Sequence, residues 1–544
     1  MFIDYSDSNG KRYSYNDLLL FAQKIDELIG KRNIVLLLAE NNIASIFAYA
    51  SCLITKNVII MLDGENTSLQ TLDGIQSIYQ ANYVWCKKSK KYFFEKEDVL
   101  IEEYGYILIK LEDDKKEINN ELALLMPTSG SVGMKKMVKL SYRNLYANTR
   151  DICHYLSITK EDVAITNLPI FYVYGLSIIN THIIKKATLV ITNDNVLNNN
   201  FWNIVTKEGV TSLSGVPFTY EMFLRCGLEK KNLDSIRYFT QAGGKMSIKL
   251  EKKILEICQT RSIDFYVMYG QSEATARISY ILITENKDKL GSVGKAIPHG
   301  KIKIYSEEGK EIKENNKEGE IVYEGENVFG GYAKELSDLI EFDQGRVLYT
   351  GDIGYLDGDN DLYITGRKNR FIKCYGKRIS LDEIEYKIDN FSSQKACVCI
   401  QRNDKLYVFL KRNVKTDEEV RRILWKEYKM WKNTISIIHI DDFEYNQYGK
   451  VQYFKMEEIA RMKERIIKCI NQISEKKVEL SELSENNFLY ELDFDSISII
   501  NLVVLLEEEF EINFSDQDIL SDSLKTFSGL CDLIKRLVGE QIGE

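Results

Sequence analysis

The stretch "TSGSVGMKK" (residues 128–136) places small hydroxyl side chains and two glycines directly before two lysines. Glycine, serine and threonine let backbone N–H groups and hydroxyls converge on one anion, and the lysines add positive charge. This composition favours a phosphate-binding loop. It is not a Walker motif, which needs a glycine, four residues and then Gly-Lys-Ser/Thr, because Gly130 and Gly133 are three apart and Met134 follows. A solvated turn after a strand is the alternative interpretation.

Six further motifs follow this loop in order along the chain. They are "PIFYVYGLS" (169–177), "QAGGKMS" (241–247), "MYGQSEAT" (268–275), "GSVGKAIP" (291–298), "YTGDIGYLDGDNDLYITGRKNRFIKCYGKRISLDEIE" (349–385) and "YGKVQ" (448–452). The series resembles the motifs of the adenylate-forming superfamily of AMP-dependent synthetases and ligases. That superfamily includes acyl-CoA synthetases, aryl-acid ligases and the adenylation domains of nonribosomal peptide synthetases. The resemblance covers residues 1 to about 457, with Lys135 at a usual proline, Met137 at a usual glycine and Ser272 at a usual threonine.

The resemblance implies a role for each residue that matches a motif. Lys450 would be catalytic, because a cation there lowers the barrier as the substrate carboxylate attacks the α-phosphate of ATP. Glu273 would be catalytic as the ligand of Mg²⁺, a hard cation that prefers oxygen ligands. The other residues implied in nucleotide binding are Thr128, Ser129, Gly130, Ser131, Gly133, Lys136, Gly243, Gly244, Tyr269, Gly270, Ser272, Asp352 and Arg367. The resemblance further implies a hinge at Asn369, and a loop around Gly376 that enters the site when the small domain rotates to form the thioester.

The same resemblance places an acid pocket at Tyr172, Tyr174, Gly175, Phe218 and Met268. Adenylation domains for α-amino acids usually carry an aspartate directly after the phenylalanine of this stretch, because a buried ammonium needs a carboxylate. Here a tyrosine stands at that position, and residues 169–180 contain no acidic residue. We therefore expect a small aryl or short acyl acid without an α-ammonium. An amino acid held in another way is the alternative, and the aromatic side chains could instead simply pack the sheet.

The C-terminal stretch "LYELDFDSISIINLVVLLEEEFEINFSDQDI" (489–519) resembles the signature of carrier proteins. Ser496 would carry 4′-phosphopantetheine, and its place at a helix start suits a phosphodiester because free N–H groups and the helix dipole favour an anion. The following apolar face is expected to be core. The acidic run 507–509 would meet a basic partner, with a solvated charge run as the alternative.

The length and the pattern of hydrophobic residues predict how these motifs are positioned. A chain of 544 residues is too long to fold around a single hydrophobic core, so several domains are expected. From residue 30 to about 300, short β-branched runs alternate with amphipathic helical patterns, which predicts an α/β fold with largely parallel sheets. Residues 318–366 are typical of short antiparallel strands, with "DGDND" as a hairpin turn, and would form a small β-barrel-like part. The last eighty or so residues are typical of helices.

We therefore expect three parts along the chain. These are an N-terminal adenylation core at 1–366, a small mobile α+β subdomain at 367–457 and an all-α, four-helix carrier domain at 458–544. The first carrier helix is expected near Glu458, a few residues after Lys450. A tether this short limits the excursions of the carrier and favours loading of the enzyme's own carrier, in cis or within a dimer.

Composition argues against several other classes of protein. A net charge of −9 and a pI near 5.4 argue against a nucleic-acid partner. The ten cysteines lack framework spacing, and the pair Cys397 and Cys399 is expected on one face of a strand, reduced and buried. The four histidines are not paired at ligand spacing, which argues against zinc. The start of the chain lacks a signal-peptide pattern, and the apolar region 33–62 is interrupted at 40–42, so a cytoplasmic protein without a membrane partner is expected.

Together these patterns predict an acid–carrier-protein ligase that forms AMP. ATP with Mg²⁺ would activate a small carboxylic acid as acyl-AMP, and the acyl group would pass to the protein's own phosphopantetheine arm. Expected partners are a phosphopantetheinyl transferase and a downstream acyltransferase or condensing enzyme of an assembly line. The alternatives are an acyl-CoA ligase with a passive carrier, an amino-acid-specific adenylation–carrier didomain, and a degenerate carrier scaffold. The joint presence of Glu273, Asp352 and Lys450 argues against the scaffold.

Overall fold

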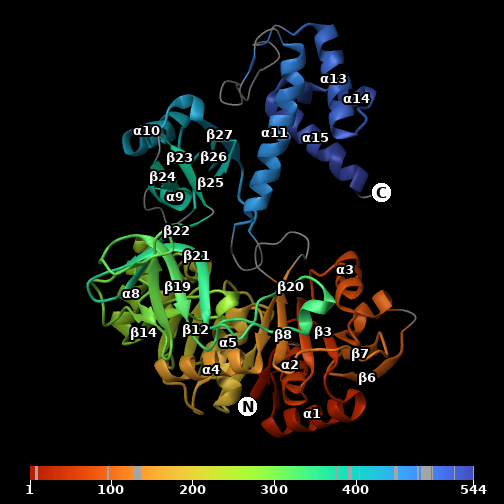
Figure 1. Ribbon diagram of the computed structural model, residues 1–544, viewed down its shortest axis with the longest axis vertical. Coiled ribbons are helices and arrows are strands. Elements are labelled where there is room, and N and C mark those ends of the chain that lie inside the picture. Colours follow the sequence, from red (N-terminus) through yellow and green to blue (C-terminus); the bar gives the residue numbers. More distant parts are fainter. Residues whose placement is uncertain are drawn as a thin grey trace. The chain divides into compact units, whose positions relative to one another are not determined.

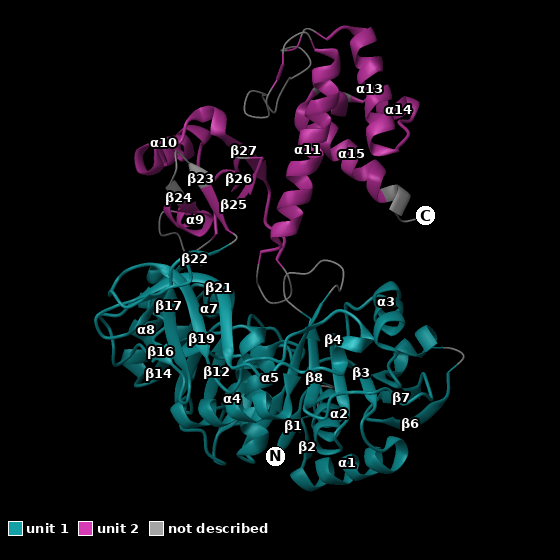
Figure 2. Ribbon diagram, in the orientation of Figure 1, with its two compact units in different colours: residues 1–368, 447–450 teal, residues 369–446, 451–544 magenta. Residues whose placement is uncertain are grey.

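The computed structural model describes most of the chain (Figure 1). The described residues are 1–6, 10–94, 97–127, 136–368, 370–374, 377–389, 395–403, 405–445, 451–474, 477–478, 492, 494–519 and 521–542. The chain divides into two compact units, one of residues 1–368 and one of residues 369–446 and 451–544 (Figure 2). Among the described helices, none combines the length and apolar character that crossing a bilayer requires.

Two sheets organise the first unit, and each has a parallel centre flanked by antiparallel pairs. One joins, in order, β16 (Lys295–Ala296), β15 (Ser279–Leu282), β14 (Asp264–Tyr269), β13 (Tyr238–Gln241), β12 (Ser212–Gly215), β10 (Val163–Ile165), β11 (Thr188–Ile191), β1 (Phe2–Asp4) and β2 (Lys11–Tyr13). The other joins β20 (Tyr332–Ala333), β9 (Met137–Ser141), β8 (Leu122–Pro127), β4 (Val58–Asp63), β3 (Ile34–Ala39), β5 (Tyr83–Lys87), β7 (Tyr106–Lys110) and β6 (Val99–Glu103). The antiparallel pairs lie at the ends of each sheet. The expected α/β fold is confirmed.

Helices alternate with the strands of these two sheets, as the pattern predicts. They are α1 (Tyr15–Ile29), α2 (Ile43–Ile54), α3 (Leu69–Tyr79), α4 (Tyr142–Tyr155), α5 (Val173–Ile184), α6 (Asn199–Lys207), α7 (Pro217–Arg225) and α8 (Ile248–Arg261). One hydrophobic core contains residues of α1, α2, α4 and α5 together with residues of both sheets, so these helices fill the space between the sheets. The apolar region 33–62 forms β3, α2 and β4, and the Asn42 side chain caps α2 by accepting from the Ser45 N–H at 2.9 Å.

A third, antiparallel sheet completes the first unit. It joins β18 (Glu311–Ile312), β17 (Lys301–Tyr305), β19 (Gly319–Glu324), β21 (Val347–Leu356) and β22 (Leu362–Arg367). The segment expected to be barrel-like takes this form. The predicted hairpin at "DGDND" connects β21 to β22, and Lys289 Nζ lies 2.7 Å from Asp357 and 2.5 Å from Asp359 in that turn.

The second unit begins with a small α+β fold. Its strands and helices are β23 (Phe371–Cys374), β24 (Lys377–Ser380), α9 (Leu381–Asp389), β25 (Cys397–Arg402), β26 (Lys405–Lys411), α10 (Asp417–Tyr428) and β27 (Ile435–Ile440). Helices α9 and α10 cover one face of the β25–β26–β27 sheet. Cys397 and Cys399 both point into that core as free thiols, which confirms the predicted buried pair on one strand face.

The long helix α11 (Tyr453–Ile473) belongs to two cores at once. Met456 and Ala460, in its first half, pack on the other face of the β25–β26–β27 sheet. Ile466 and Ile470, in its second half, pack with α13 (Ser496–Phe510) and α15 (Phe527–Ile542), and α14 (Asp516–Ile519) follows α13. The expected domain boundary at 457/458 therefore falls inside one continuous helix, and this helix begins at Tyr453 rather than near Glu458.

Candidate active site

The carboxyl ends of the parallel strands β12, β13 and β14 lie side by side at one sheet edge, the place where α/β proteins usually bind ligands. Gly243 and Gly244 follow β13, and Gly243 has a φ of +84°, which glycine adopts without strain. A Cβ on Gly243 would lie 3.2 Å from the Tyr172 hydroxyl oxygen. Gly270 follows β14, and a Cβ there would lie 1.9 Å from the Ala276 carbonyl oxygen. Both turns need glycine, and Tyr172 lies beside the first of them.

Glu273, Tyr332 and Lys136 form a chain of contacts. Glu273 lies in the short turn η3 (Ser272–Ala274) after β14, Tyr332 in β20, and Lys136 directly before β9, which pairs with β20. The Tyr332 hydroxyl donates to Glu273 Oε1 at 2.8 Å, and Lys136 Nζ lies 4.0 Å from the centroid of the Tyr332 ring. Burial and the Glu273 carboxylate raise the pKa of Tyr332, so its hydroxyl stays protonated and donates a hydrogen bond to Glu273.

The Glu273 carboxylate fits a magnesium ligand. It is half-buried, and none of the described residues forms a hydrogen bond to its second oxygen, Oε2. Ser272, one residue earlier, is half-buried as well, and no described residue bonds to its hydroxyl. A free carboxylate oxygen and a free hydroxyl, close to a lysine, suit a hard cation and the phosphate oxygens that accompany it.

Asp352, Tyr269 and Arg367 form a second polar group. Asp352 in β21 and Arg367 in β22 are direct cross-strand partners, and Arg367 Nε lies 3.2 Å from Asp352 Oδ1. The Tyr269 hydroxyl donates to Asp352 Oδ2 at 2.5 Å. Burial raises the pKa of Asp352, while Arg367 and Tyr269 oppose that rise. Gln271 Nε2 donates to the Thr350 carbonyl at 3.4 Å, so this group lies next to the turn that carries Glu273.

Several predicted residues lie outside the described part of the chain. They are Thr128, Ser129, Gly130, Ser131 and Gly133 of the loop, the hinge residue Asn369, Gly376 and Lys450. The strands that flank the loop are described: β8 and β9 pair antiparallel through Pro127 and Met137. The loop therefore starts and ends on a hairpin at the edge that also holds β20.

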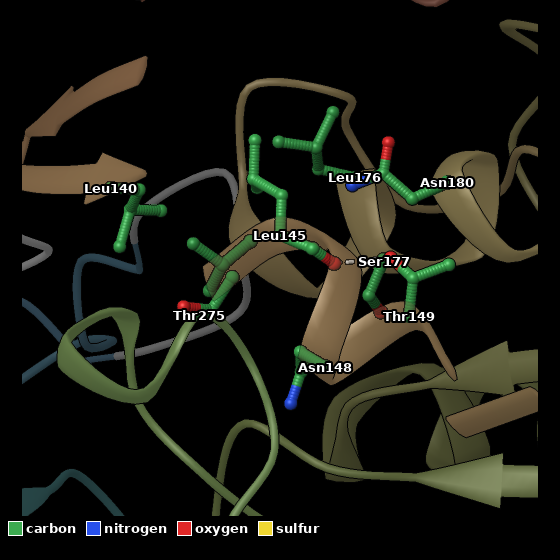
Figure 3. A pocket seen from close by; sticks show the side chains of 9 residues that line it. Leu140, Leu145, Asn148, Thr149, Leu176, Ser177, Asn180 and Thr275 are labelled. Carbon is green, nitrogen blue, oxygen red and sulfur yellow. Dashed lines mark hydrogen bonds between the residues drawn. The ribbon is translucent and has the colours of Figure 1, made fainter. Parts of the chain in front are cut away.

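Two of the predicted pocket residues line one cavity. Tyr174 and Met268 are buried, and they surround a cavity of about 20 Å³ together with Thr240, Ser177 and Arg277. The Tyr174 hydroxyl donates to the Thr240 carbonyl at 2.9 Å. A neighbouring space between α4 and α5, lined by residues that include Ser177, has no room for a water molecule (Figure 3).

The other predicted pocket residues occupy different surroundings. Tyr172 is half-buried at the N-cap of α5. Gly175 lets the first turn of α5 approach the preceding turn, because a Cβ there would lie 2.2 Å from the Pro169 carbonyl oxygen. Phe218 is the second residue of α7, is 43% exposed, and lines neither of the two cavities above.

Ser496 is exposed as the first residue of α13, where the sequence predicted a helix start. The preceding residue, Asp495, caps the helix by accepting from the Ser498 N–H at 2.8 Å. An exposed hydroxyl at a helix N-terminus fits the attachment of a phosphodiester.

The apolar face of α13 is core, as predicted. Leu502, Val503 and Leu506 are buried, with Ile499 and Phe510 packed against them. Two members of the acidic run have partners within the domain. Glu509 Oε1 accepts from Arg465 Nε at 2.8 Å, and Glu507 Oε1 accepts from the Phe514 N–H at 2.8 Å.

Two residues of this site were not predicted from the sequence. Tyr332 orients Glu273, and Arg277 lines the cavity beside Tyr174. Each lies close to a motif, but its contact depends on the fold. A tyrosine after the paired glycines at 330–331, and an arginine four positions after Glu273, are the only signals that the sequence offers.

Comparison with known proteins decides the family. Residues 8–333 match the family described as AMP-binding enzyme, and residues 464–534 match the phosphopantetheine attachment site. The chain belongs to the AMP-binding enzyme family. It is an adenylate-forming ligase with a carrier domain, and the predicted resemblance is confirmed. The attachment-site domain carries 4′-phosphopantetheine.

Several known proteins are similar to this chain, over different shares of its length. The 2-succinylbenzoate–CoA ligase of Bacillus subtilis strain 168 is 27% identical over 373 residues, which is 66% of this chain and 72% of that protein. The structure of o-succinylbenzoate CoA synthetase from Bacillus subtilis, in complex with its acyl-adenylate intermediate, has a TM-score of 0.67 at 21% identity, covering 82% of this chain and 94% of that one. The structure of McyG A-PCP complexed with phenylalanyl-adenylate has a TM-score of 0.65 at 20% identity, covering 98% and 95%. The similarity in fold to the McyG A-PCP structure extends through the carrier region.

Proposed function

We propose that the protein activates a carboxylic acid as acyl-AMP and then loads the acyl group onto the phosphopantetheine arm of its own carrier domain. The observation that carries the proposal is the union, in one chain, of an oriented carboxylate at Glu273, a buried carboxylate at Asp352 and an exposed carrier serine at Ser496. A carrier scaffold without activity would not need the first two.

In the first half-reaction, the residues of the large unit hold the nucleotide. Glu273 holds Mg²⁺, and Asp352 accepts from the ribose hydroxyls with Arg367 beside it. Lys136 supplies positive charge near the phosphates, and Lys450 stabilises the charge that builds as the acid attacks the α-phosphate. The Tyr332 and Tyr269 hydroxyls orient Glu273 and Asp352 before substrate binds, which lowers the cost of reorganisation during the reaction.

In the second half-reaction, the thiol of the arm on Ser496 attacks the acyl-adenylate and AMP leaves. Rotation of the small domain about Asn369 would remove Lys450 and bring in the loop around Gly376. The position of Ser496 at an exposed helix start supports modification by a phosphopantetheinyl transferase. A downstream acyltransferase or condensing enzyme would then remove the acyl group.

Mass spectrometry of the carrier tests the proposal. The holo-protein, prepared with a phosphopantetheinyl transferase, is incubated with ATP, Mg²⁺ and a panel of acids, and the mass of the arm is measured. We expect an acyl adduct with one class of acid and none without ATP. Absence of an adduct and of ATP–pyrophosphate exchange across the panel would favour the scaffold.

A CoA ligase with a passive carrier is the second candidate, because a similar protein, the 2-succinylbenzoate–CoA ligase of Bacillus subtilis, is a CoA ligase. The two candidates differ in the acceptor. Free coenzyme A is added in competition with the holo-carrier, and the thioester is located. Acylation of coenzyme A with an unmodified carrier would favour the second candidate.

The acid is proposed to lack an α-ammonium. Support comes from the absence of acidic residues in 169–180, where Tyr172 stands at the position of the usual aspartate. Pyrophosphate exchange with alanine against propionate tests this point, and a clear preference for alanine would refute it.

A further inference from the structure

The turn that follows Glu273 is strained at two consecutive residues. Thr275 has a φ of +60° and Ala276 has a φ of +147°, and neither residue is a glycine. Residues with a Cβ rarely adopt such values, and they persist only where the surrounding structure holds them in place. The Ala276 carbonyl oxygen also lies against Gly270, where a Cβ would be 1.9 Å away from it. The fold must therefore supply a group that holds this turn.

The side chain of Asn327 holds both ends of the strained turn. Its Nδ2 donates to the Ala274 carbonyl at 2.7 Å and to the Arg277 carbonyl at 2.8 Å, on either side of the two strained residues. The Arg277 carbonyl accepts a second, longer bond from Asn148 Nδ2 at 3.3 Å. The backbone carbonyl of Asn327 accepts from the Thr275 hydroxyl at 2.6 Å. Asn327 is 2% exposed, so these bonds are shielded from water.

Tyr323 fixes the direction in which the Asn327 amide points. The Tyr323 hydroxyl donates to Asn327 Oδ1 at 2.8 Å, and the tyrosine is fully buried. Burial raises the pKa of this phenol, so the hydroxyl stays protonated and acts as the donor. The amide oxygen accepts this bond while both N–H groups donate to the turn. An asparagine can donate twice and accept at the same time, so its side chain satisfies three partners here.

Asn327 and Tyr332 belong to one segment that contacts Glu273 through both its backbone and its side chain. The Phe329 N–H donates to the Glu273 carbonyl at 2.9 Å, and the Tyr332 hydroxyl donates to the Glu273 carboxylate at 2.8 Å. The α4 residue Asn144 fixes the segment itself, because its Nδ2 donates at 2.8 Å to the backbone carbonyls on both sides of Asn327. The segment therefore sets the position of Glu273 from three directions.

We propose that Asn327 is a positioning residue for Glu273: by holding the strained turn it orients the carboxylate toward Mg²⁺. This inference rests on the proposed function, in which Glu273 binds Mg²⁺, and deepens it. Asn327 acts through the backbone of the turn. Without its amide the strain is released, the turn relaxes and the carboxylate loses its orientation. A glycine in place of Ala276 should oppose that relaxation, because glycine adopts a positive φ without strain.

Binding of Mn²⁺, a spectroscopic probe for the Mg²⁺ site, tests the inference. It is measured by electron paramagnetic resonance with an ATP analogue that is not cleaved between its α- and β-phosphates. We expect Asn327→Ala to weaken Mn²⁺ binding by about 10-fold. The double variant Asn327→Ala, Ala276→Gly should recover most of that loss, which a merely structural role would not produce.

Asn82→Ala is the matched control. Asn82, beside β5 in the other sheet, is 1% exposed, donates to the Asp114 carbonyl at 2.9 Å and accepts from the Ile34 N–H at 3.0 Å. Its replacement removes a comparable buried amide, so it should lower the unfolding temperature and leave Mn²⁺ binding unchanged.

Tyr323→Phe provides a milder variant in case Asn327→Ala does not fold. It keeps the ring and removes only the bond that orients the amide, so Mn²⁺ binding should weaken by about 3-fold. The Mg²⁺ dependence of pyrophosphate exchange should shift by the same factors. Unchanged Mn²⁺ binding in these variants, no recovery with Ala276→Gly, or equal weakening in Asn82→Ala would overturn the inference and leave the proposed function standing. Absence of exchange in the wild type would overturn the proposed function, and Mn²⁺ binding would still decide the inference.

Discussion

Two carboxylates of the large unit are each held by a tyrosine hydroxyl. Tyr332 donates to Glu273 and Tyr269 donates to Asp352. Burial and the neighbouring carboxylate raise the pKa of both tyrosines, so the phenol proton stays on the tyrosine. Among the described residues, Glu273 uses one acceptor site in this way, whereas Asp352 also contacts Arg367 through Oδ1. Orientation by tyrosine agrees with the binding roles that we propose for both residues.

Removal of the Tyr332 hydroxyl should weaken the metal site. In Tyr332→Phe the ring beneath Lys136 remains, but Glu273 loses its hydrogen bond of 2.8 Å. Hydrogen bonds to charged groups contribute roughly 1.5–3 kcal/mol, so we expect about a 10-fold fall in pyrophosphate exchange at limiting Mg²⁺. A titration of the exchange rate with Mg²⁺ measures the effect, and Tyr349→Phe, at a tyrosine that is 59% exposed, is the control. An unchanged Mg²⁺ dependence would contradict the role given to Tyr332.

Ser496→Ala should separate activation from loading. The hydroxyl is the attachment point for the arm, whereas the nucleotide groups lie in the other unit, so exchange should persist and carrier acylation should disappear. The control is Ser498→Ala, which removes a hydroxyl from the same helical turn and keeps the one at 496. ATP–pyrophosphate exchange measures activation in each variant. Intact-protein mass spectrometry, after incubation with a phosphopantetheinyl transferase, measures the loading of its carrier. An arm still attached to Ser496→Ala would sink the assignment.

The motifs predicted every member of the Asp352 group, but of the Glu273 group they predicted Glu273 and Lys136 and not Tyr332. Tyr269, Asp352 and Arg367 lie in recognisable stretches, and the fold brings them together through the β21–β22 pairing. Tyr332 and Arg277 could not be found in this way. The bond between Tyr332 and Glu273 spans 59 residues and depends on the pairing of β20 with β9, which sequence spacing does not reveal. The charge of Arg277 becomes unusual only once its burial is known.

Individual strands and helices follow the local pattern closely, because burial on both faces gives parallel strands continuous apolar runs. β3, α2 and β4 come from one apolar region in the order that its polar interruption predicts. What the pattern could not predict is which polar group a helix buries. Glu251, in the first turn of α8, is 1% exposed. Among the described residues its Oε2 accepts from the Gly291 N–H at 3.1 Å, and its Oε1 has no partner.

The Glu251 carboxyl should make stability depend on pH. Burial raises its pKa to about 7, above the ordinary value of 4.5, so the folded state binds more protons than the unfolded state between these values. Its contribution is present below pH 4.5 and is lost as pH rises through 7. Glu251→Gln, which cannot ionise, should therefore stabilise the protein at pH 8 by on the order of 2 kcal/mol relative to its effect at pH 5. Denaturant unfolding at both pH values measures this difference, and equal effects would argue against a buried, ionising carboxyl.

At the scale of the molecule, α11 joins two domains between which the sequence pattern predicted a boundary at 457/458. Its apolar residues keep a helical spacing from Met456 to Ile470, so the pattern predicts a helix but not the change of partner halfway along it. Glu464, near the middle, accepts from Arg402 Nε and from the Tyr407 hydroxyl, both at 2.6 Å. These bonds fix α11 to the small α+β fold up to the point where the carrier core begins. We therefore expect the carrier to move together with the small fold.

An insertion in α11 tests this coupling. A six-residue Gly-Ser insertion between Glu464 and Arg465 interrupts the helix after the residue that bonds to the small fold and before the residue that bonds to Glu509 of α13. The same insertion after the exposed Asn413 is the control. Distances between labels at the exposed positions 426 and 535 are measured by single-molecule energy transfer. We expect a narrow distribution in the wild type and the control, and a broad one after insertion in α11, because a Gly-Ser segment behaves as a flexible coil. Thioester loading should slow in the α11 insertion, since the carrier no longer follows the rotation of the small domain, while exchange persists. A broad distribution in the wild type would show that α11 does not couple the two parts.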